Sequence, residues 1–165
     1  MKFFKKSLLS AVILSACNVS FAETRGFMSF DLGFGDSDFD NDIVFDIGGG
    51  IQFNEHVEFE LAYNRYGDIA PFGISVTSIS YGLNLGGKVS ENTRLYGIIG
   101  AERLEADDTV DLGIFSISVD ESATEAYFGV GANFTQSENV DLRTRFISHD
   151  SGEFWSLTGG FVIYF

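Results

Sequence analysis

The sequence has few of the residues that cross-link a chain, break strands or carry positive charge. In 165 residues it has one cysteine and one proline, and 10 basic residues stand against 24 acidic ones. A single cysteine excludes an internal disulfide framework, and the net charge of −14 argues against nucleic acid as a partner. After residue 22 no apolar run approaches the roughly 20 residues that a membrane-spanning helix needs. The chain does contain 18 Phe, 6 Tyr and 19 Gly, an aromatic content unusual for an acidic secreted soluble protein.

The N-terminal segment has the composition of a secretory signal. Three lysines within the first six residues precede an apolar stretch, Leu8–Ala16, that is too short to span a bilayer as a helix. Ser20 and Ala22 supply the small residues of a cleavage site. The sequence therefore predicts a signal peptide at 1–22 and one mature domain at 23–165; a retained N-terminal helix is the alternative.

The single cysteine, Cys17, lies inside this signal. The stretch LSAC that ends at Cys17 resembles a bacterial lipoprotein box, in which the cysteine becomes the lipidated N-terminus. Cleavage after Ala22 is favoured because that site lies just before the first strand-like segment. Lipidation at Cys17 remains the alternative.

An alternation of period two runs through nearly the whole mature chain. Met28, Phe30 and Leu32, for example, alternate with Ser29 and Asp31. Eight segments follow this pattern, and each is about as long as a tilted strand that crosses a bilayer. They are 28–35, 43–53, 57–64, 78–85, 94–102, 125–134, 140–146 and 155–165.

Two kinds of connector alternate between these segments. Three are short, at 54–56, 86–92 and 135–139, and four are of varied length, at 36–42, 67–75, 105–122 and 149–153. Short turns at one end and longer loops at the other are typical of outer-membrane barrels. Within the third long connector, 111–119 alternates again, which predicts that the hairpin extends above the membrane.

The second face of the segments is unlike a solvent-exposed face. It is small and rich in glycine, has almost no lysine, and carries charges of both signs. Such residues suit the crowded interior of a small closed barrel, with the apolar face turned to lipid. We predict an all-β, closed antiparallel up-and-down transmembrane β-barrel of about eight strands, with a soluble secreted β-sandwich or ligand-binding β-barrel in the periplasm as the alternative. The inward charges are Asp31, Asp46, Glu58, Glu60, Arg94, Glu102, Glu125, Asp141, Arg143 and Arg145.

The last segment, FWSLTGGFVIYF, carries its apolar stripe to the last residue. Phe161, Ile163 and Phe165 in this stripe resemble the C-terminal signal by which the insertion machinery recognises bacterial outer-membrane barrels. With the signal peptide and the alternation, the chain resembles the small eight-stranded barrel family that includes the outer membrane protein A transmembrane domain, the OmpX and Ail proteins and the opacity-type porins.

This resemblance implies a monomer in the outer membrane of a Gram-negative bacterium. Its surroundings would be outer-membrane lipids and lipopolysaccharide, and its assembly partner the barrel insertion machinery. It also implies a scaffold whose extracellular loops serve adhesion or envelope integrity through a partner that the sequence does not identify.

The inward charges permit two interpretations. Arg143 and Arg145 lie two residues apart, and Glu58, Glu60, Glu125 and Asp141 can face them across a barrel. A structural ion-pair network that fills the lumen is favoured because a buried charge needs a partner. A narrow ion-conducting pore is the alternative, although eight strands leave little room for one.

Two acidic clusters lie in the long connectors. The first has aspartates at every second position from Asp36 to Asp42, but an EF-hand would need Gly and Glu where Asn41 and Ile47 stand. The second cluster is Asp107, Asp108, Asp111, Asp120 and Glu121. We expect solvated loops that bind divalent cations weakly at most, and neither a metal site nor a cofactor.

One motif weakly resembles a catalytic site. His149 and Ser151 faintly resemble the His-x-Ser of lipid A 3-O-deacylase barrels, but Glu153 is too close to Ser151 for that family's spacing. We therefore assign no catalytic residues, and an enzyme that modifies lipid A is the least favoured function.

Overall fold

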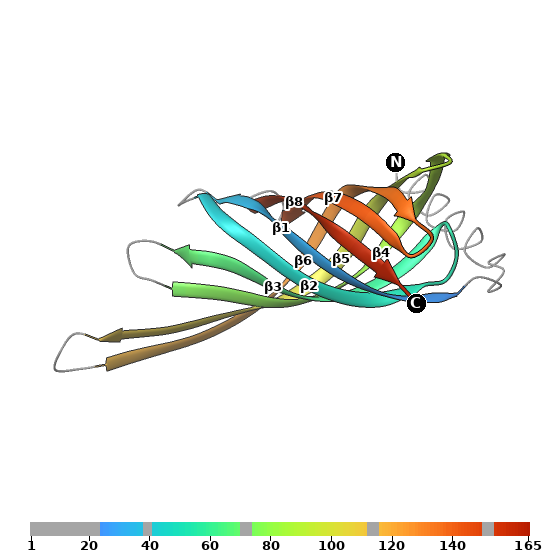
Figure 1. The fold of residues 1–165 in the computed structure, drawn as a ribbon. Helices are drawn as coiled ribbons and strands as arrows, with labels where there is room; N and C mark the ends of the chain where they lie inside the picture. Colours follow the sequence, from blue (N-terminus) through green and yellow to red (C-terminus); the bar gives the residue numbers. More distant parts are fainter. Residues whose placement is uncertain (1–23, 38–40, 70–73, 112–115, 150–153) are drawn as a thin grey trace, which may run out of the picture.

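The protein is an eight-stranded closed barrel. The computed structural model describes residues 24–37, 41–69, 74–111, 116–149 and 154–165, and all regular elements in these ranges are β-strands. The strands are β1 (Arg25–Ser37), β2 (Asn41–Gln52), β3 (Val57–Ile69), β4 (Ile74–Ser90), β5 (Thr93–Asp111), β6 (Ser116–Ser137), β7 (Val140–His149) and β8 (Phe154–Tyr164). Each strand pairs antiparallel with the next, and β8 pairs with β1 to close the barrel (Figure 1). The predicted fold class is confirmed. Across the described ranges, a search for helices long and apolar enough to cross a membrane finds none.

The two faces of the strands divide as the alternation predicts. Most large apolar side chains at outward positions are exposed, the least of these being Trp155 at 37% and the most Phe165 at 76%. Inward positions are mostly buried and polar, although Phe27, Val162 and Tyr164 form one apolar cluster inside. An exposed apolar band that continues around a barrel is favourable only in contact with lipid.

One end of the barrel carries tight turns. The connection from β4 to β5 is a turn at Glu91 and Asn92, and β6 joins β7 through a turn at Glu138 and Asn139. The predicted connectors at 86–92 and 135–139 were therefore too long. Gly86, interpreted from the sequence as part of a turn, pairs with Tyr96 in the sheet, and a Cβ there would overlap the carbonyl oxygen of Leu95. Glycine in this strand marks a close backbone approach rather than a turn.

The other end carries a long hairpin. The pairing of β5 with β6 runs from Thr93↔Phe134 to Asp111↔Ser116. Figure 1 shows this hairpin projecting well beyond the other strands, at the end opposite the C-terminus. The predicted connector 105–122 is thus largely strand, and the extension expected from the alternation at 111–119 is present in the pairing of Asp111 with Ser116.

Candidate functional site: the barrel lumen

The centre of the lumen holds five charged side chains, here called the central ion network: Asp31, Asp46, Glu60, Arg143 and Arg145. Asp31 on β1 and Asp46 on β2 are direct register partners, which places two like charges side by side. Arg145 on β7 bridges them, since its Nη2 lies 2.7 Å from Asp31 Oδ2 and 2.9 Å from Asp46 Oδ2. The network therefore ties β7 across the lumen to β1 and β2.

Arg143 makes the second set of bonds in the network. Its Nη1 donates to both carboxylate oxygens of Glu60 on β3, at 2.9 and 3.1 Å. Its Nε donates to Asp31 Oδ1 at 3.2 Å, and its Nη2 pairs with Asp31 Oδ2. Two-pronged contacts of this kind use the planar geometry of guanidinium. Arg143 thus connects β7 with both β1 and β3.

A glycine makes room for these contacts. Gly160 on β8 is the register partner of Asp31 on one side and of Arg143 on the other. A Cβ at Gly160 would overlap the carbonyl oxygen of Phe30 and Oδ1 of Asp31. The absence of a side chain here lets the guanidinium of Arg143 reach across β8 to the aspartate.

The central ion network is shielded from water. Each of its five side chains is less than one-tenth exposed, and Arg143 is 1% exposed. Glu60 also accepts hydrogen bonds from Ser29 Oγ at 2.8 Å and from Asn84 Nδ2 at 3.3 Å. Buried charges are tolerated only when paired and hydrogen-bonded in this way, and the network closes the middle of the lumen.

A second ion pair lies nearer the end with the tight turns. Arg94 Nη1 on β5 donates to Glu58 Oε2 on β3 at 2.8 Å, and both side chains are buried. Asp141, expected to face the two arginines of β7, instead accepts a hydrogen bond from Tyr164 at 3.1 Å. Of the acids expected opposite Arg143 and Arg145, Glu60 contacts both, whereas Glu58 pairs with Arg94.

A third polar cluster lies toward the end with the long hairpin, and the sequence did not reveal it. His149 Nδ1 on β7 forms a close contact with Glu102 Oε1 on β5. Glu102 Oε2 also accepts from Tyr66 Oη at 2.8 Å and from Ser78 Oγ at 2.9 Å. The inward parity of His149 and Glu102 was visible in the sequence, but their proximity depends on the strand register. Glu125, half-buried on β6, is the register partner of Glu102.

The remaining predicted residues lie outside the lumen or outside the described ranges. Phe161, Ile163 and Phe165 are on the outward face, 42, 40 and 76% exposed. Cys17, Ser151 and Glu153 fall outside the described ranges, as do the side chains of both acidic clusters. Among the described residues, no group of three or more His, Cys, Asp or Glu is placed to hold a metal ion.

The lumen has little free space at the level of the central ion network. A cavity of about 20 Å³, lined by Asp46, Arg145 and His149 among others, has room for about one water molecule. With the neighbouring charges paired across the barrel, this geometry ties the strands together at this level of the lumen.

Three comparisons place the chain among known proteins. The family model described as outer membrane protein beta-barrel domain matches residues 8–160. No curated protein has a sequence that matches this chain. The N-terminal β-barrel domain of Pseudomonas aeruginosa OprF is 15% identical, with 87% of this chain and 100% of that one covered and a TM-score of 0.62.

Two further solved structures share the fold. Neisserial surface protein A is 20% identical, with coverage of 86% and 97% and a TM-score of 0.61. Ail of Yersinia pestis, solved in complex with the heparin analogue sucrose octasulfate, is 19% identical, with coverage of 85% and 97% and a TM-score of 0.52. At these identities, the structural likeness establishes the barrel fold alone.

Proposed function

We propose that the chain, which belongs to the outer membrane protein beta-barrel domain family and is an integral outer-membrane barrel, acts as a closed scaffold. In this proposal it displays its β5–β6 hairpin and loops outside the cell, where they serve adhesion or envelope integrity. The observation that carries the proposal is the central ion network, which fills the lumen with paired and buried side chains. A barrel closed in this way acts through its outer surface and its ends. In barrels of this kind, the longer loops are extracellular and the short turns periplasmic.

The hairpin of β5 and β6 is the proposed contact element. It projects beyond the other strands (Figure 1), at the end that we assign to the extracellular side because it carries the longer loops. Two exposed edges of a hairpin outside the membrane offer unpaired backbone groups to which an extended partner segment can add. The acidic residues of this connector favour a cationic partner, or divalent cations that bridge to lipopolysaccharide, over a polyanion such as the heparin analogue bound to Ail.

Shortening the hairpin tests the scaffold function. We expect that replacing residues 107–120 by a two-residue turn leaves the amount of folded barrel unchanged but removes cell adhesion or the resistance of the envelope to detergent. Folding is measured as the change in gel mobility between unboiled and boiled samples. A matched control replaces 70–73, between β3 and β4, by the same two-residue turn. Adhesion and detergent resistance equal to those of the full-length protein would contradict the proposal.

A narrow ion-conducting pore is the second candidate. The inward arginines and acids of the barrel are the residues that would line such a pore, but the cavity of about 20 Å³ beside them is too small to favour ion conduction. In planar bilayers we expect no steady single-channel current from the intact protein. Discrete current steps that change in an Arg145→Gln variant would instead support the pore.

Several further properties belong to the same proposal. The outer-membrane lipids surround the exposed apolar band, and lipopolysaccharide is its proposed neighbour in the outer leaflet. Phe161, Ile163 and Phe165 are proposed as the stripe read by the insertion machinery, and the barrel as a monomer. Export by a signal peptide at 1–22, with lipidation at Cys17 as the alternative, also remains a proposal.

We propose no catalytic role. His149 is 4% exposed, and its ring is packed against Tyr66 and Phe154 at centroid distances of 5.7 and 4.9 Å. A substrate in the outer leaflet would have to enter the lumen to reach it.

A further inference from the structure

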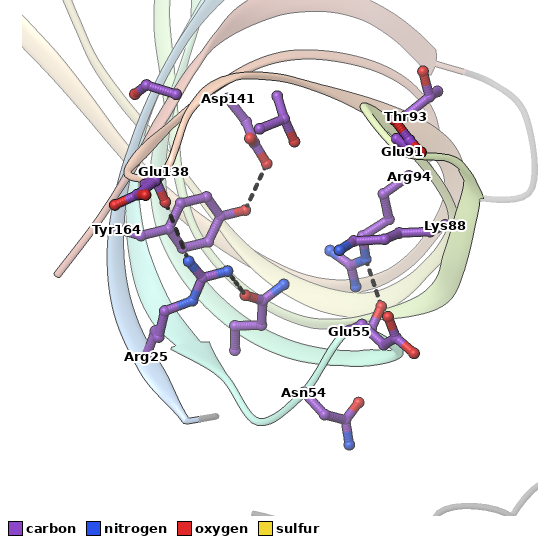
Figure 2. A pocket seen from close by; sticks show the side chains of 13 residues that line it. Arg25, Asn54, Glu55, Lys88, Glu91, Thr93, Arg94, Glu138, Asp141 and Tyr164 are labelled. Carbon is purple, nitrogen blue, oxygen red and sulfur yellow. Dashed lines mark hydrogen bonds between the residues drawn. The ribbon is translucent and has the colours of Figure 1, made fainter. Parts of the chain in front are cut away.

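The periplasmic end of the lumen contains a polar pocket of about 210 Å³, here called the periplasmic pocket. Figure 2 shows Arg25, Lys88 and Arg94 pointing into it from different strands of the wall. The position of Arg25 is fixed, since its Nη2 donates to Gln52 Oε1 at 2.9 Å and its guanidinium lies 4.5 Å from the ring centre of Tyr164. Arg94 is held in a similar way, with its guanidinium 5.1 Å from the ring centre of Tyr96, whereas Lys88 has no bonded partner among the described contacts.

Lys88 and Arg94 form a like-charged pair across two strands. They are direct register partners of β4 and β5, and both lie on the inward parity of their strands. Like charges placed directly opposite each other are destabilising unless an anion neutralises them. Glu58 pairs with Arg94, and no second acid is bonded to either cation among the described contacts.

Arg94 has an unused donor in this position. Its side chain is 7% exposed, its Nη1 donates to Glu58, and its Nε donates to the carbonyl oxygen of Glu55 at 3.0 Å. Its Nη2 is buried and has no hydrogen-bond partner among the described residues. An unmade hydrogen bond on a buried guanidinium is costly, and an oxygen anion beside Lys88 would complete it.

Irregular strand geometry accompanies the pocket. The register shifts between Lys88 and Ser90 and again between Thr135 and Ser137, and three of these four residues line the pocket. Bulges of this kind change the direction of side chains at barrel rims and next to binding sites. Here one of them immediately follows Lys88.

Acidic residues limit what the pocket can accept. Glu55, Glu91, Glu138 and Asp141 also line it, so a polyanion would be repelled. We propose that Lys88 and Arg94 bind the single oxyanion, a phosphate or carboxylate group, of a small molecule at the periplasmic mouth. The source of that group is either a free solute or the headgroup of an inner-leaflet lipid.

The test titrates inorganic phosphate into the full mature protein folded in maltoside micelles, which carry no phosphate. Nuclear magnetic resonance at constant ionic strength follows Arg94 Nε–H and the amides of Lys88 and Thr93. We expect chemical-shift changes that saturate with added phosphate. The phosphate affinity is expected to fall about tenfold in Lys88→Gln, because one charged hydrogen bond is lost, and to be largely retained in Lys88→Arg. Lys88 is exposed, and the gel-mobility shift on boiling verifies that each variant is folded.

Arg103→Gln is the matched control. It removes one positive charge from an exposed residue of β5 that pairs with Glu105 at 3.2 Å, outside the pocket. Phosphate binding equal to that of the parent protein is expected. Shifts that never saturate, or a saturable binding that Lys88→Gln leaves unchanged, would overturn the proposal.

Repeating the titration in phosphatidylcholine nanodiscs identifies the source. If lipid headgroups occupy the site, the Arg94 Nε–H resonance in nanodiscs without added phosphate already has the chemical shift of the phosphate-bound form in micelles. Added phosphate then binds more weakly than it does in micelles. If the site serves a free solute, phosphate affinity is the same in both. Each result supports the site, and neither depends on the extracellular function proposed above.

Discussion

Replacing Arg143 with methionine is expected to destabilise the barrel by about 3 to 5 kcal/mol. The variant leaves Asp31 without two of its hydrogen bonds and Glu60 with fewer donors, while both stay buried. Most of the cost comes from these uncompensated carboxylates, because the methionine side chain has no N–H to donate to them. The measurement is urea unfolding of the protein refolded into lipid vesicles, with the folded fraction read from the unboiled gel band.

Arg103→Met serves as the control for Arg143→Met. Arg103 is 62% exposed, and an exposed ion pair contributes at most about 1 kcal/mol. A second variant adds Asp31→Asn to Arg143→Met, which removes one unpaired charge. We expect the double variant to lose at least about 1 kcal/mol less than the sum of the single losses. Equal unfolding midpoints for Arg143→Met and Arg103→Met would contradict a central role for this network.

The fold could be predicted from the sequence because it depends on a local signal. A strand alternates its side chains with an exact period of two, so outward and inward residues are distinguishable wherever one face is apolar. Strand ends were less predictable. Gly86 and Gly87 indicate a turn by composition, yet β4 continues through them to Ser90, and at Gly86 the neighbouring strand β5 approaches closely.

The pairing inside the lumen could not be predicted in the same way. Parity places an arginine inside, but the stagger between strands decides which acid it meets across the barrel. Arg145 reaches Asp46, 99 residues away in sequence, whereas Asp141 on the same strand is bonded to Tyr164. The contact of His149 with Glu102 and the pairing of Lys88 with Arg94 depend on the same long-range register.

Replacing Gly160 with valine is expected to lower the free energy of unfolding by more than about 3 kcal/mol. It is also expected to remove most of the folded gel band, which is the band whose mobility changes on boiling. A Cβ at Gly160 overlaps the backbone carbonyl of Phe30 and a carboxylate oxygen of Asp31, and a backbone atom cannot move aside cheaply. The substitution acts where β8 pairs with β1, so it obstructs the closing pair of the barrel. It also occupies the space through which Arg143 reaches Asp31.

The adjacent glycine provides the matched control for this second prediction. Gly159 lies on the outward face, and a Cβ there would meet its nearest atom, the carbonyl oxygen of Arg143, at an ordinary 3.8 Å. Gly159→Val therefore adds a strand-favouring apolar side chain toward lipid and is expected to change the stability by less than about 1 kcal/mol. Because the two variants are neighbours with identical chemistry, a difference between them isolates the inward contact. If Gly160→Val unfolds at the same urea concentration as Gly159→Val, then the row formed by Asp31, Gly160 and Arg143 does not control closure of the barrel.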